Sequence, residues 1–296
     1  MRRGSFGPTA WRWGTSTEMA GPTSADTTRQ VPCARLRRSG SAKSRRTIPN
    51  DFGDCSMLRH VRLAVLMPAY DEAVGLSHTL ASLSSVAESA GGITVFLVDD
   101  GSHVPIEAAS LPEPSPVFSL VLARHPVNLG QGAALETARQ LALREPPFAA
   151  YVTMDADGQH RPEDAIALAH AVALGADVAF GDRSRGNSNV PVSRAALLFF
   201  ARLFERVLTG LSVSDAHNGL RAFSRRGLEA ISIRQNRMAH ATEIKQRVSQ
   251  AGSLSVVEVP VSLRYSEETL KKGQRGAGAA DILRDLALQY LFGESK

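Results

Sequence analysis

The chain has 296 residues, of which 43% are hydrophobic, so it can bury one sizeable core. Residues 1–57 contain ten Lys or Arg and four Asp or Glu, whereas residues 58–296 contain 24 and 25 and are near neutral. A near-neutral body is not the footprint of a duplex-binding protein, so no nucleic acid partner is expected. No run of about 20 apolar residues occurs, which argues against a membrane-spanning helix.

The first 57 residues form a basic leader. They are rich in Arg, Ser, Thr, Gly and Pro without periodicity, which is typical of disorder, and they lack the apolar segment of a secretory signal. Translation starting at Met57, or a basic arm that touches anionic lipid, are alternatives. Both cysteines, Cys33 and Cys55, lie here, so the body suits a reducing cytoplasm. We expect a disordered leader (1–57) and one domain (58–296).

Apolar runs then alternate with helical patterns. Strands are expected at residues 62–67, 93–98, 118–123, 148–154 and 177–180, and helices at 73–90, 133–143 and 162–174. Continuous apolar strands separated by helices predict an α/β fold with a mostly parallel central sheet flanked by helices. Further along, helices are expected at 192–208, 241–250 and 279–292, a strand at 256–259, and a loop, DAHNGLRAF, at 215–223.

Polar clusters follow the strands, where α/β sheets bind ligands. In VTMDADGQHRPED (152–164), Asp155, Asp157 and Gln159 stand at every second position. If the segment is extended, they face one side and offer hard oxygen ligands that suit Mg²⁺ or Mn²⁺. A solvated Asp-Gly turn is the alternative for an isolated pair of carboxylates.

The clusters PAYDE (68–72) and DDGS (99–102) suggest a nucleoside site. Tyr70 offers a face for base stacking, and Glu72 offers a carboxylate. Alternatively, Glu72 is an acidic residue in the first turn of a helix, where it favours the helix dipole. Asp99 and Asp100 would accept from ribose hydroxyls or a base N–H, or cap a helix. NLGQGAA (128–134) contains GxG without a third glycine, which predicts a phosphate- or sugar-facing loop or an ordinary tight turn.

Cations gather in GDRSRG (181–186) and LKKGQRG (270–276). Arg183, Arg185, Lys271, Lys272 and Arg275 fit either phosphate neutralisation or solvated basic loops. No His/Cys cluster has zinc spacing, and neither GxSxG nor a P-loop occurs.

The motifs PAYDE, VDDGS, NLGQGAA, DADGQH, GDR and DAHNGLRAF occur in this order and are followed by EVPV at 258–261. Together they resemble a family 2 glycosyltransferase, nearest to the dolichol-phosphate or polyprenol-phosphate mannosyltransferase and glucosyltransferase branch. The resemblance covers nearly all of residues 61–275. It implies the nucleotide-diphospho-sugar fold called GT-A, an inverting sugar transfer from a donor of the GDP-mannose or UDP-glucose type, and Mg²⁺ or Mn²⁺.

The resemblance also implies roles for individual residues. Those expected to bind the nucleotide sugar are Pro68, Tyr70, Glu72, Asp99, Asp100, Gly130, Asp155, Ala156 and Asp157. Those expected to hold the metal are Asp155, Asp157 and Gln159. Those expected on the acceptor or its phosphate are Arg183, Arg185, Arg221, Lys272 and Arg275, and Arg183 is also a catalytic candidate. A lipid phosphate is already anionic and needs little base catalysis, whereas a hydroxyl acceptor would need a base, for which Asp215 is the first candidate and Glu243 the second.

The expected acceptor is a polyprenyl phosphate, reached by a cytoplasmic protein peripheral at the inner face of the membrane. Residues 192–208, an amphipathic pattern with three arginines, would lie at the interface or pack on the core. Residues 283–292 would dock on a small integral-membrane partner or close the domain. The alternatives are a cell-envelope or other polysaccharide acceptor, or a non-catalytic nucleotide-sugar-binding partner of a membrane complex. A nucleotidyltransferase and an NAD-binding protein are disfavoured, because PAYDE replaces the phosphate loop and the third glycine is absent.

Overall fold

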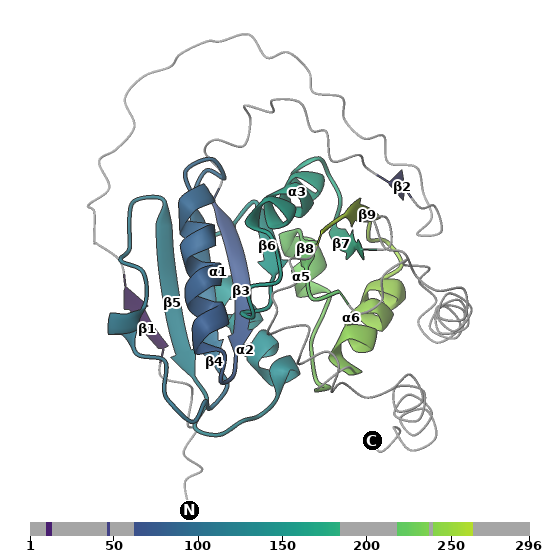
Figure 1. Ribbon diagram of the computed structural model, residues 1–296. Coiled ribbons are helices and arrows are strands. Elements are labelled where there is room, and N and C mark those ends of the chain that lie inside the picture. The colour runs from purple at the N-terminus through teal and green to yellow at the C-terminus, as the bar shows by residue number, and fades with distance from the viewer. Residues whose placement is uncertain (1–9, 14–45, 48–61, 184–217, 237–238, 263–296) are drawn as a thin grey trace, which may run out of the picture.

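The computed structural model describes residues 10–13, 46–47, 62–183, 218–236 and 239–262 (Figure 1). Within these residues one sheet has the strand order β1-β5-β4-β3-β6-β8-β7-β9-β2. Its strands are β1 (Ala10–Trp13), β2 (Arg46–Thr47), β3 (Leu63–Ala69), β4 (Ile93–Asp99), β5 (Phe118–Arg124), β6 (Ala150–Thr153), β7 (Val178–Asp182), β8 (Arg221–Phe223) and β9 (Val256–Pro260). The helices are α1 (Ala73–Val86), α2 (Gln131–Arg144), α3 (Pro162–Ala173), α5 (Arg225–Glu229) and α6 (Ala239–Gln250), with a 3₁₀ turn, η2, at Ala108–Ser110.

The sheet is parallel where the apolar runs predict it. β5, β4, β3 and β6 pair in parallel, as do β7 and β9. Every residue of β3, β4, β6 and β7 is buried, which explains why these strands are continuously apolar. Because the parallel strands share a direction, their carboxyl ends meet at one edge.

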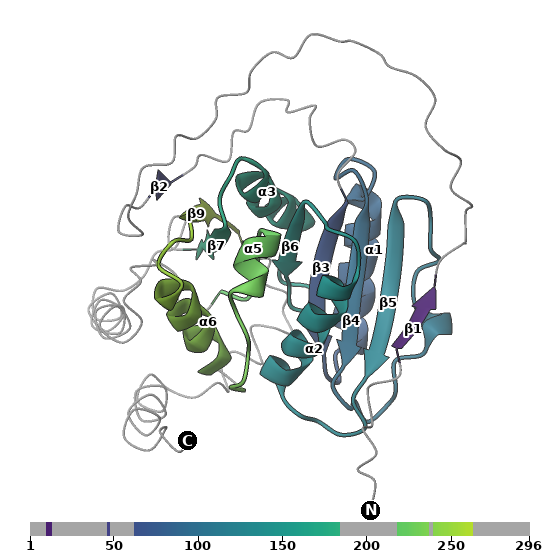
Figure 2. The same ribbon diagram turned by 180° about the vertical axis from the view of Figure 1, so that it is seen from behind.

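Helices cover both faces of the sheet. Side chains alternate along β3, so Val65 joins a core cluster with Leu80 of α1, whereas Leu66 joins a second cluster with Leu135 of α2. The first cluster also takes in α3, and the second takes in α5 and α6. The result is three layers, with α1 and α3 on one face of the sheet and α2, α5 and α6 on the other (Figures 1 and 2).

The prediction of a loop over 215–223 is wrong for Arg221–Phe223. These residues form β8, which runs antiparallel to both β6 and β7 and makes the sheet mixed. Three buried residues are too few to show a strand period in the sequence. The helix that follows, α5, has a sequence signal that we missed: the Oγ of Ser224 accepts from the backbone N–H of Gly227 and caps it.

Two strands come from the basic leader. β1 pairs antiparallel with β5 and β2 pairs in parallel with β9, at opposite edges of the sheet. The rest of residues 1–57 lies outside the described residues, so its disorder stays a prediction. The helices expected at 192–208 and 279–292 also lie outside them.

Glu136 on α2 carries a testable stability effect. Burial raises its pKa, but hydrogen bonds from Arg139, Gln140 and the N–H of Ile233 outweigh burial and lower it below the ordinary 4.5. The ionised carboxylate therefore stabilises the fold above about pH 4.5, and this contribution is lost as pH falls through the lowered pKa.

We expect Glu136→Gln to reduce the free energy of unfolding at pH 7 by about 2 kcal/mol. The deficit should narrow only below about pH 4.5, where the wild type loses the same charge. Urea unfolding at pH 7, 5 and 3 measures this, with Glu229→Gln, an exposed helix pair, as the control expected to cost under about 1 kcal/mol. A deficit that is the same at all three pH values would contradict the account.

Candidate active site

A cleft of about 390 Å³ opens at the carboxyl ends of the parallel strands. It is lined by Pro68, Ala69, Tyr70, Glu72, Asp100, Asn128, Gly130, Gln131, Asp155, Ala156 and Asp157. The structure therefore brings together all the residues expected to bind the nucleotide sugar, except Asp99. Ala69, Asn128 and Gln131 also line the cleft; they lie in the PAYDE and NLGQGAA motifs but are not among the residues expected individually.

Asp155 and Asp157 follow the end of β6. Asp155 Oδ1 accepts from Gln131 Nε2 at 2.9 Å, and its Oδ2 lies 3.4 Å from His160 Nε2. Asp157 accepts from both the backbone N–H and the side-chain amide of Gln159, at 3.0 and 2.7 Å. Thus Asp155 and Asp157 both face the cleft, while Gln159 turns its amide N–H to Asp157 and is not among the lining residues.

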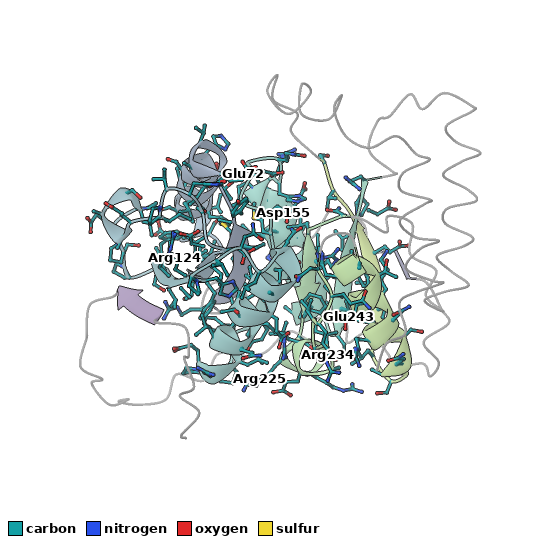
Figure 3. The ribbon with its side chains drawn as sticks, turned by 90° about the horizontal axis from the view of Figure 1, so that it is seen from below. Glu72, Arg124, Asp155, Arg225, Arg234 and Glu243 are labelled. Atoms are coloured by element: carbon teal, nitrogen blue, oxygen red, sulfur yellow. The ribbon has the colours of Figure 1, made fainter. Side chains whose placement is uncertain are left out.

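The two carboxylates differ in pKa. Burial raises the pKa of Asp157, and the negative charges of Asp155 and Glu72 raise it further. Burial also raises the pKa of Asp155, but His160 and the charge of Arg221 outweigh burial and lower it. Figure 3 shows Glu72 and Asp155 at the same end of the molecule. The cleft therefore concentrates negative charge that a cation would relieve.

The donor set fits a hard divalent cation with few protein ligands. Within the described ranges, no three His, Cys, Asp or Glu side chains are grouped as a complete metal site. Mg²⁺ is usually held by one or two carboxylates plus substrate phosphates, and Asp155 and Asp157 meet that requirement.

A glycine lets β8 approach the carboxylates. A Cβ at Gly219 would overlap Oδ2 of Asp155, so no other residue fits there without moving that carboxylate. Two residues later Arg221 is only 2% exposed, and its charge lowers the pKa of Asp155 from within the sheet. Contact of Arg221 with an acceptor stays a prediction.

Asp99 has a structural environment. It is fully buried, accepts from the backbone N–H of Ser102 at 2.9 Å and of Ile106 at 3.2 Å, and pairs with Arg124. These contacts shape the loop after β4. The carboxylate of Asp99 is engaged in holding this loop, and Asp99 is not among the residues that line the cleft.

Asp100, the next residue, does border the cleft. It accepts from the N–H groups of Leu129 and Gly130 at 3.0 and 2.7 Å, and it lies 2.7 Å from His125 Nδ1. The backbone N–H groups of the NLGQGAA loop therefore bind Asp100. The side chain of Gln131, from the same loop, bonds to the cleft carboxylate of Asp155.

Tyr70 stands at the edge of the cleft and is 39% exposed. Its ring centroid lies 6.1 Å from that of His103. Asp71 has a left-handed φ of 50°, donates its N–H to Ser102 Oγ and accepts from the N–H of His103. These bonds fasten the loop after β3, which carries the exposed ring of Tyr70, to the loop after β4.

The other candidates are dispersed. Glu243 lies on α6 next to Arg234 and apart from Asp155 (Figure 3), and it is not among the cleft residues. This position does not suit a general base, which must reach the acceptor hydroxyl. Arg183 directly follows β7. Asp215, Arg185, Lys272 and Arg275 lie outside the described residues.

The Glycosyl transferase family 2 model matches residues 64–232. The polyprenol monophosphomannose synthase of Mycolicibacterium smegmatis is 29% identical over 71% of this chain and 80% of its own. The undecaprenyl-phosphate mannosyltransferase of Micrococcus luteus is 28% identical over 76% of this chain and 93% of its own.

Among solved structures, the glucosyl-3-phosphoglycerate synthase of Mycobacterium tuberculosis, in complex with Mn²⁺ and UDP-glucose, has a TM-score of 0.56 at 16% identity, covering 81% of this chain and 84% of that one. This likeness confirms the expected GT-A fold. Among the described helices, none combines the length and apolar character needed to cross a bilayer. Since the family match spans more than half of the sequence, the chain belongs to glycosyl transferase family 2 and is a glycosyltransferase.

Proposed function

We propose that this glycosyltransferase moves a sugar from a nucleotide-diphosphate sugar to a polyprenyl phosphate, with inversion at the anomeric carbon. The observation that carries the proposal is the cleft, which is lined by the exposed aromatic ring of Tyr70 and by the carboxylates of Asp155 and Asp157. The relatives named as polyprenol- and undecaprenyl-phosphate mannosyltransferases support the acceptor class.

In this proposal, Tyr70 stacks on the base and Asp100 borders the nucleoside. Asp155 and Asp157 would hold Mg²⁺ or Mn²⁺ beside the diphosphate, and the cation would offset the repulsion that Asp155 and Glu72 exert on the charge of Asp157. A divalent cation held there would act as a Lewis acid on the departing nucleoside diphosphate. The Mn²⁺ and UDP-glucose bound by the similar solved structure agree with this donor side, and GDP-mannose is the other donor that we propose to test.

In this proposal, a phosphate acceptor needs no general base. An ionised phosphate oxygen is already a nucleophile, so attack on the anomeric carbon needs no proton removal. This agrees with Glu243 lying apart from the cleft. We propose that this phosphate is held by cationic side chains: Arg183, Arg185, Arg221, Lys272 and Arg275. The protein would then work at the inner surface of the membrane, where such acceptors reside.

The donor half is tested by thermal unfolding of the full chain with UDP, GDP, UDP-glucose and GDP-mannose, each with Mn²⁺, Mg²⁺ or EDTA. We expect one nucleotide series to raise the melting temperature only with metal, since a ligand at 100 times its Kd adds about 2.7 kcal/mol to the folded state. If the protein is folded and no nucleotide shifts its melting temperature with either metal, the proposal is wrong.

A further inference from the structure

The segment of residues 233–236 crosses between α2 and α6 and contacts both. Ile233 donates its N–H to Glu136 of α2 at 2.9 Å. Arg234 and Gln235 donate theirs to Glu243 Oε2 of α6, each at 2.8 Å. Three consecutive N–H groups of an irregular segment are thus fixed by two carboxylates from two helices.

The last residue of this segment, Asn236, bonds to the loop that borders the cleft. Its Nδ2 donates to the carbonyl of Leu129 at 2.7 Å, and its Oδ1 accepts from the N–H of Ala133 at 3.0 Å. Helix α2 begins after Gly130, which has no side chain to cap it. Asn236 therefore caps α2 from a position 103 residues away from Ala133.

Two glycines permit this approach. A Cβ at Gly130 would lie 2.7 Å from Asn236 Cγ, and a Cβ at Gly132 would overlap the carbonyl oxygen of Gln235. Gly130 also has a φ of 97°, which side chains rarely adopt. The two glycines of NLGQGAA therefore allow residues 233–236 to pack closely against this loop.

The same loop reaches the carboxylates. Gly130 and Gln131 line the cleft, and Gln131 Nε2 donates to Asp155 Oδ1 at 2.9 Å. A continuous set of contacts therefore runs from Glu243 through Asn236 to Gln131 and Asp155. Each step is a hydrogen bond or a direct chain neighbour.

We infer that Glu243 and Asn236 are positioning residues for the donor site: they hold the Leu129–Ala133 backbone so that Gln131 meets Asp155. This inference rests on the proposed function for the identity of the ligand. It assigns to Glu243 a role different from that of a base. Its Oε2 accepts two N–H bonds, and its Oε1 lies 3.3 Å from Arg247 Nη2.

Kinetics separate the two roles of Glu243. The Oε1 of a glutamine can accept both N–H groups, so Glu243→Gln should keep kcat and the KM for the nucleotide sugar within about threefold. A general base would lose about 10²- to 10⁴-fold in kcat with that change. Glu243→Ala and Asn236→Ala should raise the KM for the donor, and the Kd of the matching nucleoside diphosphate with Mn²⁺, about tenfold, with kcat reduced much less.

Amide hydrogen exchange of the ligand-free protein gives a second readout. Exchange at Leu129–Ala133 should become faster in Asn236→Ala and Glu243→Ala, and return toward the wild-type rate in Glu243→Gln. Glu229→Gln on α5 is the control, and it should change neither exchange at this loop nor donor binding.

Wild-type Kd and exchange in Asn236→Ala would overturn the inference, as would a loss confined to kcat in Glu243→Gln. Failure of the proposed function has a different signature. The wild type would then bind no nucleoside diphosphate with any metal, and the donor role of the segment would fall with it, whatever the exchange rates show.

Discussion

Replacing Asp157 by Asn should lower kcat for sugar transfer about a thousandfold, a loss of about 4 kcal/mol in transition-state stabilisation. The melting temperature of the ligand-free protein should stay the same or rise. Transfer is expected to fall because the carboxylate that we propose holds the metal beside the diphosphate loses its charge. Stability is retained because that charge is unfavourable in the fold, where burial, Asp155 and Glu72 raise the pKa of Asp157.

The sign of the pH effect follows from this shift. A carboxyl whose folded pKa lies above its ordinary 3.8 holds its proton more tightly when folded. Its favourable contribution exists at low pH and is lost as pH rises through the raised pKa. The gain in melting temperature of Asp157→Asn over the wild type should therefore be larger at pH 8 than at pH 4.

Asp164→Asn provides the matched control for this experiment. The pKa of Asp164 is also raised by burial, but this residue lies on α3, away from the cleft, and accepts from the N–H of Ser262. Its substitution should leave kcat within about twofold of the wild type. A near-normal kcat in a folded Asp157→Asn variant would remove Asp157 from the proposed metal site.

A second large effect is expected at Gly219. A methyl group there overlaps Oδ2 of Asp155, so Gly219→Ala must displace the carboxylate, β8 or both. Overpacking of this kind costs about 1–3 kcal/mol of stability. The displaced carboxylate should also weaken nucleoside diphosphate binding with Mn²⁺ by tenfold or more, or about 1.4 kcal/mol.

Gly227→Ala separates the local effect from general destabilisation. A Cβ at Gly227 would overlap the backbone carbonyl oxygen of Asp177, and Gly227 lies on α5, which does not line the cleft. We expect a fall in melting temperature at least as large as that of Gly219→Ala, because the contact is with backbone, but unchanged nucleotide affinity. Scanning calorimetry measures the melting temperature, and titration calorimetry well below the transition measures the affinity. Equal losses of affinity in the two variants would mean that Gly219 matters for folding alone.

Much of the fold could be predicted because its strands are buried on both faces. Apolar runs such as Ile93–Asp99 have no alternation to misread, and polar residues at their carboxyl ends mark the ligand edge. The carboxylates Asp155 and Asp157 were found in this way. β8 could not be, because three residues set between two other strands leave no pattern.

Several site details depend on contacts that local sequence does not encode. Asp99 and Asp100 are neighbours of the same type, yet one holds a loop inside the protein and the other borders the cleft. The side chain of Asn236 bonds to Ala133 and Leu129, which are 103 and 107 residues away along the chain. Glu243 is the second base candidate from the sequence, and its bonds to the N–H groups of Arg234 and Gln235 are contacts that the sequence around it does not reveal.

The most direct test of the account is formation of a lipid-linked sugar. The full chain would be incubated with polyprenyl phosphate in phospholipid vesicles, Mg²⁺ or Mn²⁺, and radiolabelled GDP-mannose or UDP-glucose, beside the Asp157→Asn and Asp164→Asn variants. We predict solvent-extractable labelled lipid from one donor, dependent on metal, retained by Asp164→Asn and lost in Asp157→Asn. Nucleotide binding without labelled lipid from either donor, or equal labelling by the Asp157→Asn variant, would contradict it.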